Sequence, residues 1–176
     1  MKDSKLIQKL HSGDKEAAGI IIERYYEDIY RFCLYMVQIE ADAYDITQET
    51  FLKFMKYGSS YKHNNLKGYL LTIARNLCFD YFRNKSQKAA AADWEELDKH
   101  QTRTDRMAET EDAVYLKNLI KELSEDIREV VILRTYEEMR FKDIAKIMGC
   151  SLSTAKSRYR LGISQLKRMM ENEYER

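Results

Sequence analysis

The absence of proline is the feature that most constrains the fold of this 176-residue chain. Proline ends or kinks helices and marks tight turns, and glycine, the other residue typical of turns, occurs only six times. Leu, Ile, Ala, Glu, Lys and Arg, which are abundant, all favour helices. We therefore predict an all-α protein of long, uninterrupted helices, with enough residues for one ordinary domain or two small helical ones.

Apolar residues at spacings of three and four predict four helices in residues 1–86. After a short first helix, a longer one begins at Asp14, which is a good N-cap residue. The third helix, near residues 41–57, ends at Gly58, where Gly-Ser-Ser is a stop signal. The apolar face of the fourth helix consists of Leu66, Leu70, Ile73, Ala74, Leu77 and Tyr81. Together these patterns predict a four-helix domain.

Residues 87–112 carry four basic and eight acidic side chains and a single large aromatic residue, Trp94. A segment with so little apolar material builds no core of its own. We predict a flexible linker at residues 87–110, between a domain of residues 1–86 and a second domain of residues 111–176. The four consecutive alanines in this linker are also compatible with an extension of the preceding helix, whose end the pattern leaves open.

Residues 141–170 have the order of elements that a helix-turn-helix requires, and they follow two shorter predicted helices. Ala145, on the first helix of the motif, is small enough to let a second helix cross close by. Gly149 supplies the left-handed backbone that ends this helix, and Ser151 is a good N-cap for the next. The predicted apolar face of that second helix consists of Leu152, Ala155, Tyr159, Ile163, Leu166 and Met170.

Residues 152–170 carry five basic side chains and no acidic one. Away from the apolar face, or at its flanks, lie the residues that we call the basic face: Ser153, Thr154, Lys156, Ser157, Arg158 and Arg160. Hydroxyl groups and long cations suit a helix in the major groove of DNA, where Arg bonds guanine edges and Lys neutralises phosphates. The alternative is a packed helical hairpin with a solvated basic exterior. We favour binding to duplex DNA because turn, cap, small residue and charge agree.

The third helix has one polar face that suggests a binding surface. We call it the acidic ridge, and it consists of Asp45, Gln48, Glu49 and Leu52. The residues expected opposite to it are Ala43, Ile46, Thr47, Thr50, Phe51 and Phe54. An acidic stripe with an embedded leucine is typical of a partner-binding surface, and an ordinary solvated helix face is the alternative.

The loop before the fourth helix and one side of that helix interleave aromatic, cationic and amide side chains. The loop carries Tyr61, Lys62, His63, Asn64 and Asn65. Off the apolar face of the helix lie Arg75, Phe79, Phe82 and Arg83. Splayed single-stranded bases are bound by stacking and by hydrogen bonds to their edges, which these residue types supply. Extra aromatic packing in a small bundle is the alternative.

Three segments before the helix-turn-helix carry a resemblance to a known family. They are DAYDITQETFLKF at residues 42–54, LKGYLLTIARNLCFDYFR at residues 66–83 and LSEDIREVV at residues 123–131. With the helix-turn-helix, in this order, they resemble the extracytoplasmic-function class of sigma factors of bacterial RNA polymerase. The resemblance implies a four-helix sigma region 2 and a helix-turn-helix sigma region 4, joined by a flexible linker. The residues that depart from those common in the family are Tyr44, Tyr69, Ser153 and Ala155.

The resemblance also implies roles for the residues that match. The acidic ridge would bind the clamp helices of the polymerase β′ subunit, and the second domain would also bind the β flap. The basic face would recognise the −35 promoter element as duplex. The −10 element, with a flipped base of the non-template strand, would be bound by Tyr61, Lys62, His63, Asn64, Asn65, Arg75, Asn76 and Arg83. A common further partner in this family is an anti-sigma factor.

The sequence leaves two other function classes as alternatives. A repressor or activator with a helical dimerisation domain explains residues 141–170 equally well, but it leaves the acidic ridge and the aromatic loop unexplained. An enzyme is disfavoured, because the sequence has no phosphate-binding glycine loop and no Glu-x-x-His metal pair. Cys33, Cys78 and Cys150 form no disulfide or metal pattern, so we expect no cofactor and no metal ion.

The sequence also bounds the location of the chain. No apolar stretch approaches the roughly 18–20 residues that a membrane span needs, and the N-terminal residues lack the apolar core of a signal peptide. We therefore expect a cytoplasmic protein without membrane insertion.

Overall fold

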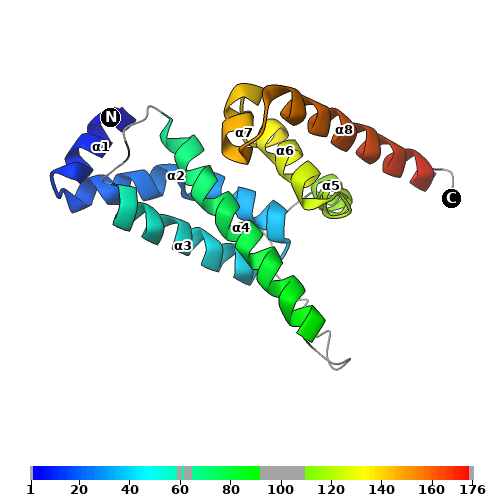
Figure 1. The fold of residues 1–176 in the computed structure, drawn as a ribbon, viewed down its shortest axis with the longest axis horizontal. Coiled ribbons are helices and arrows are strands. Elements are labelled where there is room, and N and C mark those ends of the chain that lie inside the picture. Colours follow the sequence, from blue (N-terminus) through cyan, green and yellow to red (C-terminus); the bar gives the residue numbers. More distant parts are fainter. Residues whose placement is uncertain (1, 59–60, 62–64, 92–109, 175–176) are drawn as a thin grey trace. The chain divides into compact units, whose positions relative to one another are not determined.

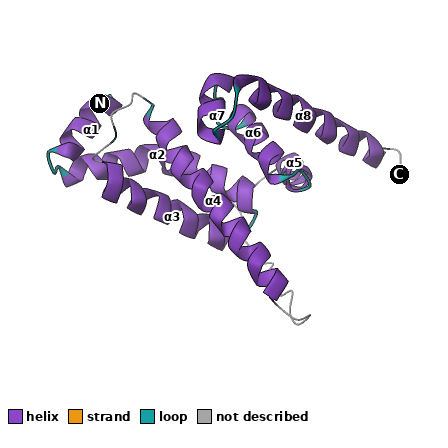
Figure 2. Ribbon diagram, in the orientation of Figure 1, coloured by secondary structure: helices purple, strands orange, loops and turns teal. Residues whose placement is uncertain are grey.

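The computed structural model describes residues 2–58, 61, 65–91 and 110–174, and within these ranges it contains helices and turns but no strand (Figures 1 and 2). The helices are α1 (Asp3–His11), α2 (Lys15–Val37), α3 (Glu40–Tyr57), α4 (Leu66–Ala91), α5 (Glu111–Lys121), α6 (Glu125–Thr135), α7 (Phe141–Met148) and α8 (Leu152–Tyr174). The chain divides into two compact units, Met1–Gln101 and Thr102–Arg176. The predicted all-α class with two small helical domains is therefore confirmed.

In the first unit α2, α3 and α4 pack against one another, and α1 packs on α2. Asp14 caps α2 as predicted, because its carboxylate accepts hydrogen bonds from the backbone N–H groups of Glu16 and Ala17 at 2.9 and 3.4 Å. The fully buried side chains of this core include Ile21, Ile29, Phe32, Phe54 and Leu70. The helix periodicity thus places one apolar face of each helix toward a shared centre.

Two polar contacts fix α4 against its neighbours in this unit. The Tyr81 hydroxyl donates a hydrogen bond to the carboxylate of Asp42 on α3 at 2.8 Å. The Lys67 ammonium lies 2.9 Å from the carboxylate of Asp28 on α2. Partial burial, together with the hydrogen bond to Asp42, raises the pKa of Tyr81 well above its usual value. The start and the middle of α4 are therefore tied to different helices.

The last turns of α4 extend beyond the core of the first unit. Every residue from Arg83 to Ala91 is exposed, and Figure 1 shows this end of α4 continuing past α2 and α3. The end of the helix, which the sequence left open, lies at Ala91 inside the segment predicted as a linker. The rest of that segment up to residue 109 lies outside the described residues, so the predicted domain boundaries stay a prediction.

In the second unit α6, α7 and α8 pack together, and α5 contacts α8. Gly149 has a φ of 64° and ends α7, and the N–H of Cys150 donates to the carbonyl oxygen of Ala145 at 3.0 Å, which completes a Schellman turn. The Ser151 hydroxyl then accepts a hydrogen bond from the N–H of Thr154 at 3.0 Å, so it caps α8. Both turn residues act as the sequence predicted.

The predicted apolar face of α8 is wrong at both of its ends. Ala155 and Leu166 are buried as expected, but Leu152 is 44% exposed and Met170 is also exposed. Leu152 is the first residue of the helix, and Met170 lies in the part of α8 that runs on beyond α6 and α7 in Figure 1. Spacing predicts which residues share a face, but burial also requires a neighbouring helix to cover that face.

At Gly162 α8 closely approaches α6. A Cβ atom on this glycine would lie 2.6 Å from Cγ2 of Val131 and 2.8 Å from Cγ2 of Ile127, distances that no side chain tolerates. Ala145, for which the sequence predicted the close crossing, is also buried, but no role was predicted for Gly162. The absence of a side chain at residue 162 thus sets how closely α8 packs on the unit that supports it.

Candidate partner and nucleic-acid surfaces

The acidic ridge on α3 is exposed along its whole length. Asp45, Gln48 and Glu49 are exposed, and Leu52 is 64% exposed. The residues predicted to lie opposite are all buried: Ala43, Ile46, Thr47, Thr50, Phe51 and Phe54. The hydroxyls of Thr47 and Thr50 donate to the carbonyl oxygens one turn earlier at 2.7 and 2.8 Å, so these polar groups cost little when buried. The two faces of α3 are therefore separated as the sequence predicted.

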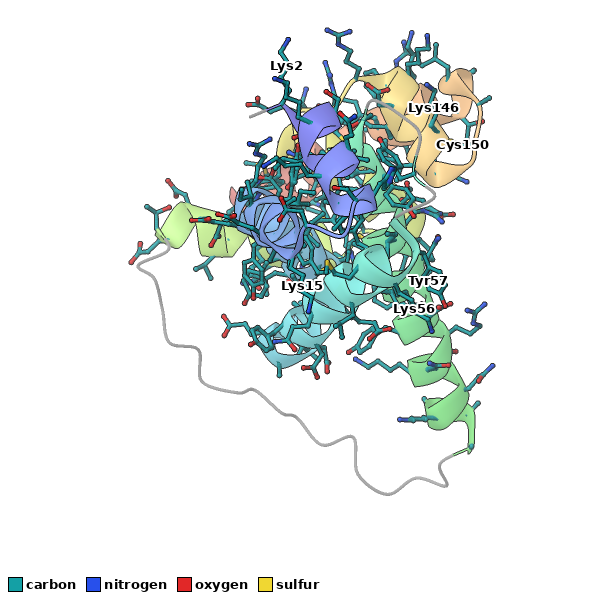
Figure 3. All side chains as sticks on the ribbon, turned by 90° about the vertical axis from the view of Figure 1, so that its left-hand side faces the viewer. Lys2, Lys15, Lys56, Tyr57, Lys146 and Cys150 are labelled. Atoms are coloured by element: carbon teal, nitrogen blue, oxygen red, sulfur yellow. The ribbon has the colours of Figure 1, made fainter. Side chains whose placement is uncertain are left out.

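Further apolar side chains on α3 extend this surface. Tyr44 and Met55 are exposed, and their helical spacing places them next to Gln48 and Leu52. At the end of the helix the Lys56 ammonium lies 5.2 Å from the centre of the Tyr57 ring, and Figure 3 shows these two side chains together. Sequence reasoning missed Met55, although its position three residues after Leu52 is the signal that identifies it. Apolar groups rimmed by acids are typical of a protein-binding surface.

The ends of the loop before α4 have structural roles that the sequence did not reveal. Tyr61 is only 5% exposed, and its ring stacks on Tyr69 at 4.6 Å between centroids; burial raises its pKa. The side-chain oxygen of Asn65 accepts a hydrogen bond from the N–H of Gly68 at 2.9 Å, which caps the start of α4. Lys62, His63 and Asn64 lie outside the described residues. Tyr61 is therefore packed against Tyr69 of α4, and its proposed contact with a base stays a prediction.

One side of α4 carries stacked cations and aromatic rings. The Arg75 guanidinium lies 4.5 Å from the centre of the Phe79 ring, and Phe79 meets Phe82 edge to face at 6.0 Å. Asn76 and Arg83 are exposed, and Arg83 forms an ion pair with Asp80. Arg75, Phe79 and Phe82 are half-buried, but so are Ile73, Leu77 and Tyr81 of the predicted apolar face, so burial does not separate the two sides of α4. Flat, partly exposed groups of this kind offer surfaces on which bases stack.

Most residues of the basic face of α8 are exposed to solvent. Ser153, Lys156, Ser157 and Arg160 are exposed. Thr154 is half-buried, and its hydroxyl lies 2.8 Å from that of Ser151, so it belongs to the helix cap as well. The N-terminus of α8 adds the partial positive charge of its free N–H groups to this face. The face is therefore suited to an anionic polymer.

Arg158 differs from the other cations of the basic face because it already contacts an acid. Its guanidinium lies 3.6 Å from the carboxylate of Asp126 on α6, and the two side chains are 33% and 50% exposed. An ion pair this exposed is worth only about 0–1 kcal/mol. The contact therefore orients Arg158 at the edge of the basic face without preventing it from binding another anion. The sequence gave no sign of this pairing.

The orientation of α7 beside α8 rests on residues that sequence reasoning also missed. Phe141 at the start of α7 meets Tyr159 of α8 edge to face at 5.4 Å. The Arg134 guanidinium lies 4.8 Å from the centre of the Phe141 ring and donates a hydrogen bond to the carbonyl oxygen of Met139 at 2.8 Å. These contacts fix the two helices of the motif in one arrangement.

Neither a metal-binding cluster nor a membrane-spanning helix is present in the described residues. They contain no group of three or more His, Cys, Asp or Glu side chains that would hold a metal ion. Cys33 and Cys78 are buried and Cys150 is half-buried, all three as free thiols. None of the helices in the described ranges is both long and apolar enough to cross a membrane.

Two family models match the chain, one in each unit. Sigma-70 region 2 matches residues 21–88, and Sigma-70, region 4 matches residues 113–166. The first match includes the acidic ridge and the aromatic side of α4. The second includes the helix-turn-helix with the basic face.

Curated relatives and solved structures agree with these matches. The ECF RNA polymerase sigma factor SigM of Bacillus subtilis is 30% identical over 138 residues, which cover 78% of this chain and 85% of SigM. The ECF RNA polymerase sigma factor BldN of Streptomyces coelicolor is 26% identical over 174 residues, covering 96% of this chain and 66% of BldN. The sigma factor RpoE of Bartonella quintana, solved in complex with the anti-sigma factor NepR, has a similar fold, with a TM-score of 0.76 and 23% identity over 87% of this chain and 96% of RpoE.

Proposed function

Because the chain belongs to the extracytoplasmic-function (ECF) class of the sigma-70 family, it is a transcription initiation factor, and we propose that it directs core RNA polymerase to specific promoters through their −35 and −10 elements and promotes melting of the DNA. In this role it acts in the cytoplasm, where the polymerase is, and it leaves the chemistry of RNA synthesis to the polymerase.

The observation that carries the proposal is that one chain presents both an exposed acidic ridge on α3 and an exposed basic face on α8. A repressor needs only the second of these surfaces. The acidic ridge, with Leu52 as its apolar anchor, is suited to the clamp helices of the polymerase β′ subunit. The second unit would contact the β flap.

The −10 element is the proposed ligand of the aromatic side of α4 and the preceding loop. Extrusion of a base costs a few kcal/mol, which stacking and edge hydrogen bonds must offset. Arg75, Asn76 and Arg83 provide cations and an amide beside the ring of Phe79. The loop would contribute Tyr61, Lys62, His63, Asn64 and Asn65.

The −35 element is the proposed ligand of the basic face, bound as duplex in the major groove. The five cations of residues 152–170 need not bind tightly by themselves. Once the first unit is attached to polymerase, the tether raises the effective concentration of α8 at the promoter. An anti-sigma factor is a further proposed partner, supported by the complex in which the structural relative RpoE was solved.

Run-off transcription with purified core polymerase on a library of promoters tests the proposal. We expect transcripts from a subset of promoters that share sequence near −35 and −10, and only when the chain is present. DNA binding without any polymerase-dependent transcript would instead support the repressor hypothesis. Binding as a dimer to a palindromic site would support it further.

A further inference from the structure

Leu152 is an exposed apolar residue at the first position of the proposed DNA-binding helix. The sequence pattern predicted that it would be buried, but 44% of its surface is exposed. Its position is fixed on both sides, because Ser151 caps the helix directly before it and Ala155, one turn later, is fully buried. The exposure therefore follows from the packing of α8.

The surroundings of Leu152 are polar and basic. Ser153 follows it, and Lys156, one turn along the same side of the helix, is exposed as well. Residues 152–170 include no acidic side chain, so this part of α8 favours a negatively charged partner. Single exposed apolar residues are common on protein surfaces. Leu152 differs from them because it lies on the first turn of the proposed recognition helix.

In helix-turn-helix proteins the N-terminal residues of the recognition helix contact base edges in the major groove. Side chains of a helix also lean toward its N-terminus, which directs Leu152 outward from the first turn. The apolar group that bases present in the major groove is the C5-methyl group of thymine. We propose that Leu152 is a specificity-determining residue that packs against the C5-methyl group of a thymine in the −35 element. The inference rests on the proposed function of α8.

Other exposed apolar residues of α8 do not qualify. Leu161 is 49% exposed but lies nine residues further along, about 13 Å from Leu152 at the helical rise of 1.5 Å per residue. Nine residues are two and a half helical turns, so Leu161 lies on the opposite side of α8 from Leu152 and does not reach the base that Leu152 would contact. Leu161 therefore serves as a matched control, since it is an equally exposed leucine on the same helix.

The experiment replaces each thymine of the −35 element, one at a time, by deoxyuridine, which keeps the hydrogen-bonding groups and lacks only the methyl group. The DNA is a promoter selected in the run-off experiment, and the protein is the full chain bound to core polymerase. We expect one replacement to weaken binding of the wild-type holoenzyme about fourfold, as for the loss of one buried methyl group. Leu152→Ala should bind the thymine promoter about as weakly and should not respond to that replacement. Leu161→Ala should respond as the wild type does.

Leu152→Met provides a second test, because it keeps an apolar side chain and should retain the response to the methyl group. The inference is overturned if every deoxyuridine replacement affects the wild type and Leu152→Ala equally, or if no replacement affects the wild type. A wild-type holoenzyme that binds without any dependence on the −35 sequence overturns the proposed function of α8 first, which distinguishes the two failures. Thermal unfolding shows that each variant is folded.

Discussion

Helices α3 and α8 each carry a proposed binding surface, but their neighbours cover them differently. α3 lies against α2 and α4, so its inward residues from Ala43 to Phe54 are all buried and one ridge is left exposed. α8 is buried where Ala155, Gly162 and Leu166 meet the rest of the second unit, and apolar side chains are exposed near both of its ends. A helix supported along its length presents one fixed surface to a partner. α8 is held along one side from Ala155 to Leu166, which leaves the other side of its first turns exposed to a partner.

The largest effect is expected at the acidic ridge. Asp45→Arg combined with Leu52→Ala should abolish co-purification with core polymerase, because the apolar anchor is lost and the charge at its edge is reversed. Loss of a central anchor alone costs about 2 kcal/mol or more. Both side chains are exposed, so the thermal unfolding of the variant should match that of the wild type.

The control for this variant is Glu23→Arg, which reverses an exposed acid on α2 outside the ridge. It should co-purify with polymerase as the wild type does. Undiminished co-purification of the ridge variant would mean that α3 does not provide the polymerase-binding surface.

The next largest effect concerns how α8 is held. Gly162→Leu should destabilise the second unit by about 2–3 kcal/mol, because its side chain would overlap Val131 and Ile127. Gly19→Ala on α2 is the matched control, since nothing lies within 4 Å of a Cβ atom there, and it should stabilise the first unit by about 0.5–1 kcal/mol. Denaturant unfolding of both variants measures the difference. Equal stability of Gly162→Leu and wild type would show that α8 is free to move away from α6.

The contrast between α3 and α8 also explains which features the sequence could predict. The two faces of α3 and the caps at Asp14, Gly149 and Ser151 depend on local spacing and local hydrogen bonds, and they were found as predicted. The exposure of Leu152 depends on where the neighbouring helices end. Helical periodicity does not predict how neighbouring helices pack against one another.

Contacts between distant residues were missed for the same reason. The pairing of Arg158 with Asp126 and the close approach at Gly162 join α8 to α6, and neither partner identifies the other in the sequence. Asn65, which was predicted to bind a base, also caps α4 through its side-chain oxygen, and the base contact stays a prediction. An asparagine three residues before a glycine suits either role, and only the helix boundary identifies the cap.

Arg158 tests whether the basic face recognises sequence or only charge. Arg158→Ala should weaken binding to the selected promoter by roughly 1–3 kcal/mol if its guanidinium makes a bidentate base contact. Binding to a promoter with a scrambled −35 element should change much less. An equal loss on both DNAs would make Arg158 a phosphate contact.

Asp126→Asn refines the interpretation of Arg158. The variant removes the ion pair at 3.6 Å and keeps the size of the side chain. Because the pair is exposed, the effect on stability should be within about 1 kcal/mol. If Asp126 orients Arg158 for a base contact, the variant should lower the preference for the selected promoter over the scrambled one. In an Arg158→Ala background Asp126→Asn should have no effect on that preference.

The smallest expected effect concerns the hydrogen bond that joins α4 to α3. Tyr81→Phe removes the donor to Asp42 and should destabilise the first unit by about 0.5–1.5 kcal/mol at neutral pH. Burial and this hydrogen bond raise the pKa of Tyr81 in the folded state above its unfolded value of 10.0. The stabilisation is therefore fully present below pH 10 and is lost as the pH rises above that value. Denaturant unfolding between pH 8 and 11 should show the gap between wild type and variant narrowing with rising pH, and a constant gap would mean that Tyr81 ionises as easily in the folded protein as in the unfolded one.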